Sequence, residues 1–247
     1  MIFVESTLQG IPGEIYASII VLAVITVISL IIFFKVRKAN PLAKPKGILH
    51  LAEIGVSTFD NMVKTNMGVR FQKLAGYFLA IAMFLFLSFI VGIFGIPSPM
   101  NYLMVPFSLA LITFVMIHAL SIKDKKWGYF KRYVDPFPVF LPINLLSMWS
   151  PLLSMTFRMF GNAIAGWALM GLISWGLEGV GSLIFGALLP VGLTPIFFAP
   201  FIMPWLHLYF DLFTAFIQTL VFISLSMILV AQEANPEADI EKAEIVS

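Results

Sequence analysis

The chain contains long stretches in which no side chain carries a charge. Residues 15–34 form the first, a run of 20 residues. As a helix rising about 1.5 Å per residue, this run would be about 30 Å long, which is the thickness of the hydrocarbon core of a bilayer. Similar runs occupy residues 74–96 and 103–122. Only 11% of the residues are charged, whereas an ordinary soluble domain carries about 25%. The sequence therefore predicts an integral membrane protein.

Two further apolar segments, residues 151–177 and 204–231, are longer than a membrane requires. Each would be about 40 Å long as a helix, so both are expected to be strongly tilted and to form a hairpin. The first starts after Ser150, a favourable N-cap residue followed by Pro151. The expected fold class is all-α, with five membrane-inserted helices.

Residues 47–66 have a different pattern, in which apolar and polar residues alternate at helical spacing. An amphipathic helix of this kind is expected to lie on the cytoplasmic interface of the membrane. We expect one membrane domain over residues 1–247, with an external N-terminus (1–14), a first span (15–34), this interfacial helix, two spans (74–96 and 103–122), two tilted helices (151–177 and 204–231) and a polar tail (232–247).

The basic residues indicate the orientation of this layout. Thirteen of the 15 lysines and arginines follow either the first or the third predicted span. Loops rich in lysine and arginine stay in the cytoplasm, so the N-terminus is expected outside and the C-terminus inside.

Several kinds of chemistry are excluded or disfavoured by composition. The chain has no cysteine, so disulfides and thiolate metal sites are impossible, and its three histidines are far apart. We expect neither a metal nor a cofactor. The net charge of +2 is too small to indicate binding to nucleic acid. No phosphate-binding loop or dinucleotide-binding glycine pattern occurs, so no nucleotide site is expected in this chain.

Arg158 is the first candidate functional residue, because it lies within a predicted membrane helix. A charged side chain near mid-membrane costs about 2.5–3.5 kcal/mol on insertion scales, so it should face protein or water. Ser154, Arg158 and Asn162 follow one another at intervals of four and form one polar stripe. Small residues beside this stripe leave room for a neighbouring helix: Gly161, Ala165 and Ala168. A structural ion pair or snorkelling to the interface is the less favoured account.

A second polar stripe lies on the last helix, where residues spaced by four, three and four share one face: His207, Asp211, Thr214 and Gln218. Ionisable groups within the membrane commonly mark ion pathways. Two alternatives stay open: Thr214 and Gln218 could simply bond a neighbouring helix, and Asp211 could be the direct ion-pair partner of Arg158. Glu178, at the outer end of its helix, is a further pathway candidate, although a solvated carboxylate at the rim is the favoured account of it.

The segment Arg158-Met159-Phe160-Gly161-Asn162-Ala163-Ile164-Ala165-Gly166, preceded by Ser154, resembles the signature of subunit a of the rotary F-type ATP synthases. The segment Thr214-Ala215-Phe216-Ile217-Gln218-Thr219-Leu220 resembles the last helix of that family. With a weaker similarity around residues 61–68, the resemblance extends from about residue 48 to residue 231.

The resemblance implies a stator subunit that couples proton or sodium flow to rotation. Two tilted helices would clasp a ring of c subunits, each bearing one carboxylate, and Arg158 would be the essential arginine that favours the ionised form of a passing carboxylate. Asn162 matches the family's asparagine one turn later, and His207 a polar position of the outer half-channel. The implied partners are the c-ring, the b subunits of the peripheral stalk and the rest of the complex, in the bacterial plasma membrane. ATP formation itself would occur elsewhere in that complex.

The chain also departs from the family's pattern. The family commonly has a glutamine where Thr214 stands, and many bacterial members have an acidic residue where Trp167 stands. The acidic residue that the family often has two or three turns before the arginine is also absent. We expect Asp211 and Gln218 to supply the missing polar functions. The alternative functions are a secondary transporter that uses Arg158 as an anion site, and a scaffold protein without transport.

Overall fold

The computed structural model describes residues 13–40, 44–126, 129, 137–185 and 199–233. Its helices, in chain order, are α1 (Gly13–Lys38), α2 (Ile48–Met67), α3 (Ala75–Ile90), α4 (Met104–Lys125), α6 (Leu141–Phe185) and α7 (Ala199–Glu233). Short 3-10 helices are η1 (Val69–Leu74), η2 (Val91–Phe94), η3 (Pro99–Asn101) and η4 (Pro138–Phe140). Within these ranges there is no strand, and 5 helical segments are long and apolar enough to cross a membrane. The predicted all-α integral membrane fold is confirmed.

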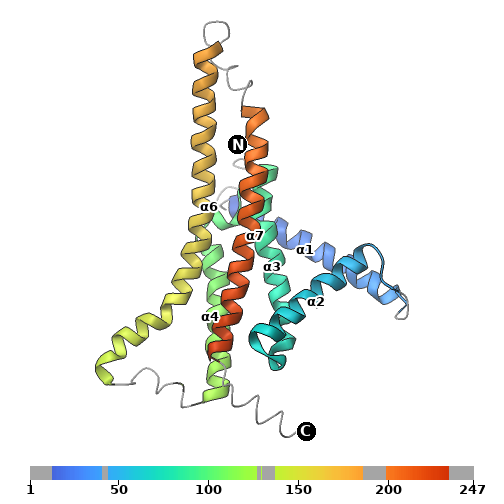
Figure 1. The fold of residues 1–247 in the computed structure, drawn as a ribbon, viewed down its shortest axis with the longest axis vertical. Coiled ribbons are helices and arrows are strands. Elements are labelled where there is room, and N and C mark those ends of the chain that lie inside the picture. Colours follow the sequence, from blue (N-terminus) through green and yellow to red (C-terminus); the bar gives the residue numbers. More distant parts are fainter. Residues whose placement is uncertain (1–12, 41–43, 127–128, 130–136, 186–198, 234–247) are drawn as a thin grey trace.

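Helices α3, α4, α6 and α7 pack together into a bundle (Figure 1). The upper end of the bundle, as drawn in Figure 1, is where α6 ends and α7 begins. Its core consists of large side chains that lie fully between the helices: Phe78, Leu85, Met100, Leu152, Met159, Phe222, Ile223 and Met227. In a water-soluble protein, burying each of these side chains would stabilise the fold by roughly 1.5–3 kcal/mol. Lipid is as apolar as leucine, so within a membrane the helices are held together by close packing instead.

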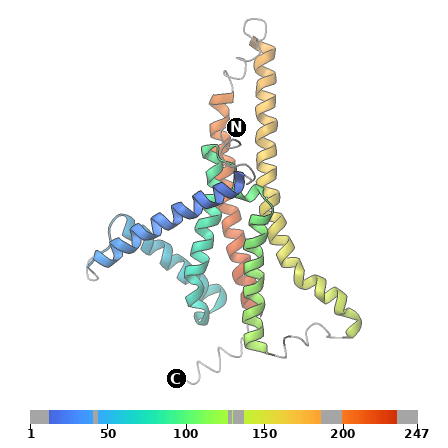
Figure 2. The same ribbon diagram turned by 180° about the vertical axis from the view of Figure 1, so that it is seen from behind.

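α1 and α2 form a wing that leaves this bundle, as Figures 1 and 2 both show. α1 contacts the bundle through its first turns, where Ala17 and Val21 are buried. α2 returns toward the base of α3 and buries Val63 and Met67 near its C-terminal end. Its remaining face is largely exposed, which fits an amphipathic helix placed at an interface.

α6 is longer than the segment predicted for it, residues 151–177. The structure has one helix from Leu141 to Phe185, with Pro151 inside it rather than at its start. A proline inside a helix removes one backbone hydrogen bond and kinks the helix. Figures 1 and 2 show α6 bent, with its lower part inclined away from the bundle. α7 also continues beyond its predicted segment and contains Pro204.

Several predicted features lie outside the described residues. They are residues 1–12 of the N-terminus, Lys131 and Arg132 of the second basic stretch, most of the connection between the tilted helices, and residues 234–247 of the polar tail.

Candidate functional site

Arg158 lies on the exposed side of α6. The opposite side of the same turns is packed into the bundle, where Met155 and Met159 are buried. Ser154 and Asn162 are exposed beside Arg158, so the predicted polar stripe is open to the surroundings. Gly161, Ala165 and Ala168 are exposed as well, and a Cβ atom built on Gly161 would meet nothing within 4 Å. This side of α6, which we call the small-residue face, is free to receive another helix.

The guanidinium of Arg158 makes no hydrogen bond or ion pair with any residue that the structure describes. An unpaired charge within an apolar helix is costly unless it meets water or a partner molecule. The alternative in which Asp211 pairs directly with Arg158 is wrong, because the carboxylate of Asp211 lies beside His207.

Asn162 connects α6 to α7. Its Nδ2 atom donates a hydrogen bond to Oε1 of Gln218 over 2.8 Å. Gln218 is only 2% exposed, so its carboxamide lies between the helices rather than on a lipid-facing surface. The two polar stripes predicted from the sequence thus meet at this bond, one turn from Arg158.

The Asn162–Gln218 bond predicts a measurable coupling between these side chains. Replacing either one by leucine leaves the other without its partner, while replacing both removes the mismatch. In a double-mutant cycle for SDS-induced unfolding of the full chain, we expect a coupling free energy of about 0.6–1.7 kcal/mol. As a control, Thr156→Val should be additive with Gln218→Leu within about 0.5 kcal/mol, because Thr156 bonds the carbonyl of Leu152 in its own helix. A coupling of zero between positions 162 and 218 would contradict the bond.

His207 and Asp211 form a second polar pair, one turn apart on α7. Nδ1 of His207 and Oδ2 of Asp211 are 3.1 Å apart, and both side chains are partly buried. The backbone of η2, which directly follows α3, lies close to this pair. A Cβ atom built on Gly92 of η2 would lie 3.3 Å from Oδ2 of Asp211. Gly92 is not among the residues predicted from the sequence, because no pattern around it indicates that the carboxylate of another helix lies against its backbone.

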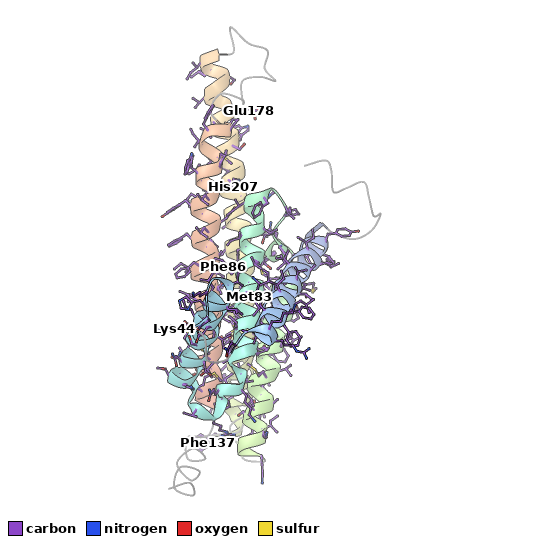
Figure 3. The ribbon with its side chains drawn as sticks, turned by 90° about the vertical axis from the view of Figure 1, so that its right-hand side faces the viewer. Lys44, Met83, Phe86, Phe137, Glu178 and His207 are labelled. Carbon is purple, nitrogen blue, oxygen red and sulfur yellow. The ribbon has the colours of Figure 1, made fainter. Side chains whose placement is uncertain are left out.

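A cavity of about 340 Å³ opens next to this pair. It is lined by His207 together with Ile93, Pro200, Met203 and Pro204. Since one water occupies about 30 Å³ of liquid, the cavity has room for several water molecules. Figure 3 places His207 and Glu178 toward the upper end of the bundle, with Glu178 above His207.

The remaining predicted residues do not lie together in one cluster. Thr214 is half-buried between Asp211 and Gln218 on α7 and makes no side-chain hydrogen bond with a described residue. Ser154 and Glu178 are exposed on α6. Within the described part of the chain, no group of three or more histidine, aspartate or glutamate side chains is placed to hold a metal ion.

Comparison with known proteins gives one consistent result. A family model described as ATP synthase A chain matches residues 17–231. ATP synthase subunit a of Sulfurihydrogenibium sp. is 28% identical over 217 residues, which cover 86% of this chain and 94% of that protein. ATP synthase subunit a of Mycoplasmoides gallisepticum is 25% identical over 226 residues, covering 84% of this chain and 73% of its own length. The chloroplastic subunit a of Oedogonium cardiacum is 27% identical, with 86% and 81% covered.

Proposed function

Because the chain belongs to the ATP synthase A chain family and is a stator subunit of that complex's membrane sector, we propose that Arg158 faces the carboxylates of a rotating c-ring. The observation that carries this proposal is the guanidinium of Arg158, which is exposed on the small-residue face of α6 and has no partner within the described ranges of the chain. A fixed positive charge stabilises the ionised form of a carboxylate that passes it. Each ring carboxylate would therefore release its ion before reaching Arg158 and take up another ion after passing it.

The Asn162–Gln218 bond supports this role by fixing the two helices relative to each other beside Arg158. Catalytic and ion-handling groups must be held within a fraction of an ångström by neighbours that do not move. We assign to this pair the task of keeping α6 at a constant distance from the ring.

We assign His207 and Asp211 to the outer half-channel. The cavity next to His207 can hold water, and the imidazole and carboxylate can pass a proton inward along α7 toward Thr214. Glu178, which Figure 3 places above His207, would contribute negative charge near the entrance to this pathway. Ser154, one turn from Arg158 on the other side, would belong to the opposite half-channel.

Gly92 gives a direct test of the geometry of this pair. Gly92→Val brings a Cβ atom to 3.3 Å from Oδ2 of Asp211 and adds two methyl groups beyond it, so the carboxylate is pushed from its position beside His207. We expect ATP-driven acidification of inverted vesicles to slow by about 10- to 100-fold, since displacements near 1 Å have effects of this size. The matched variant Gly76→Val should change the rate by less than about twofold, because a Cβ atom at Gly76 meets nothing within 4 Å. Equal pumping rates for the two variants would show that the space beside Gly92 has no part in the function of the His207–Asp211 pair.

The orientation and partners follow from the same proposal. We place the N-terminus outside and the C-terminus in the cytoplasm of a bacterial plasma membrane, because the basic residues after α1 and at the end of α4 favour that side. The c-ring would cover the small-residue face of α6, and the b subunits of the peripheral stalk would bind elsewhere on the subunit.

Purification of the tagged chain in a mild detergent tests the whole proposal. We expect ATPase activity and an oligomeric ring of hairpin subunits to co-purify with the chain, each hairpin having two spans of about 20 residues and one buried acid. A chain that purifies alone and takes up a solute in proteoliposomes would instead support a secondary transporter.

A further inference from the structure

The wing carries a dense group of positive charges at its far end. Three of the cations are in the last turn of α1 and two are in the segment that leads into α2: Lys35, Arg37, Lys38, Lys44 and Lys46. All five side chains are exposed. The sequence contains no acidic residue between Glu14 and Glu53, so nothing within this stretch offsets the charge. We call these five residues the basic cluster.

The acidic residues of α2 are engaged with other side chains. Oδ2 of Asp60 lies 2.7 Å from Nζ of Lys64 and accepts a hydrogen bond from Gln72. The hydrogen bond from Lys64 lowers the pKa of Asp60 below its usual value of 3.8, so this pair is charged at neutral pH. Glu53 lies 3.9 Å from His50. Among the residues that the structure describes, no carboxylate lies within ion-pair distance of the basic cluster.

Exposed apolar side chains directly adjoin these cations. Phe33, Phe34 and Val36 are each more than half exposed on α1, and the start of α2 exposes Ile48 and Leu51. The guanidinium of Arg37 lies 5.6 Å from the ring centre of Phe33. A surface at the boundary between acyl chains and headgroups has aliphatic stems and aromatic rings on one side and charged ends on the other, as this one does.

We propose that the basic cluster binds the phosphate groups of anionic phospholipids. Lysines and arginines next to the cytoplasmic end of a membrane helix attract anionic lipid by about 1 kcal/mol each. The wing projects from the bundle, so lipid can surround it on several sides (Figures 1 and 2). Figure 3 views the molecule from the side to which the wing points and labels Lys44. An acidic protein segment could also satisfy the charges, but the adjoining exposed aromatic and aliphatic side chains match acyl chains better. This inference does not depend on the role of Arg158.

The test measures which lipids the full chain retains. The tagged protein is reconstituted in vesicles of phosphatidylcholine with a minor fraction of phosphatidylglycerol, re-extracted in mild detergent, and its bound lipid is quantified by mass spectrometry. We expect phosphatidylglycerol to be enriched over its share in the vesicle. The variant Lys38→Gln/Lys44→Gln/Lys46→Gln should lose about 10-fold or more of that enrichment. The control Lys73→Gln/Lys123→Gln/Lys126→Gln removes three exposed charges elsewhere and should retain it.

Two further measurements keep the result decisive if the glutamine variant fails to fold. The charge-preserving variant Lys38→Arg/Lys44→Arg/Lys46→Arg should retain the enrichment. In the unmodified protein, raising the salt from 0.15 M to 1 M shortens the screening length from about 8 Å to about 3 Å and should weaken it. If the unmodified protein retains the two lipids in the proportion in which the vesicle contains them, the proposal is overturned. It is overturned as well if the folded glutamine variant keeps the full enrichment.

Discussion

Arg158→Ala is expected to reduce ATP-driven proton pumping in inverted vesicles by about 100- to 1000-fold, the range for removal of a preorganised charge-stabilising group. Without the guanidinium, nothing on the small-residue face would force a ring carboxylate to release its ion. The complex should still assemble, because the described part of the chain gives the guanidinium of Arg158 no hydrogen bond or ion pair whose loss would disturb the fold.

The control for this variant is Lys123→Ala, which removes an exposed charge at the end of α4. Its pumping rate should match that of the unmodified complex. Pumping by the assembled Arg158→Ala complex at even half the normal rate would rule out the proposed role of this residue, whereas failure to assemble would favour the scaffold interpretation.

Asp211→Asn is expected to have the second-largest effect, slowing coupled pumping by about 100-fold. The asparagine keeps the size of the side chain and can still bond His207, but it cannot take up and release a proton. Because the change is nearly isosteric and Asp211 is only partly buried, the packing of η2 against α7 should persist.

Two variants separate loss of the proton carrier from loss of structure. Asp211→Glu restores a carboxylate and should recover part of the rate, while Glu53→Gln on α2 removes an exposed acid and should leave the rate unchanged. Wild-type pumping by Asp211→Asn would mean that the outer half-channel does not use this carboxylate.

The membrane fold could be predicted because its main determinant is local. Runs such as residues 15–34 contain no charge, and a helix is the only isolated segment that satisfies its own backbone hydrogen bonds in lipid. The start of α6 could not be predicted in the same way. Pro151 follows a favourable cap residue and looks like a first helical position, yet α6 runs through it from Leu141 to Phe185. A proline inside a helix can bend it without ending it, and periodicity does not distinguish the two outcomes.

The two polar stripes were also predictable, because residues spaced by three and four share a helix face. Which residues meet across the stripes was not. Periodicity places Asn162 on one helix and Gln218 on another, but their bond depends on the axial shift between α6 and α7. The same limit explains the Asp211 alternative: sequence allowed it to pair with Arg158, and the helix packing joins it to His207 instead.

Disulfide mapping tests the central claim most directly, and the chain suits it because it has no cysteine of its own. The two substitutions are Ala165→Cys and Trp167→Cys, both at exposed positions of α6. Position 165 is on the small-residue face, and position 167, two residues further along the helix, is on the side away from Arg158. Each is paired with a cysteine placed one turn from the carboxylate of the c subunit in the assembled complex. We expect oxidation to cross-link the ring to position 165 and not to position 167. A cross-link to 167 alone, or to neither position in an active complex, would contradict the claim that Arg158 faces the rotor.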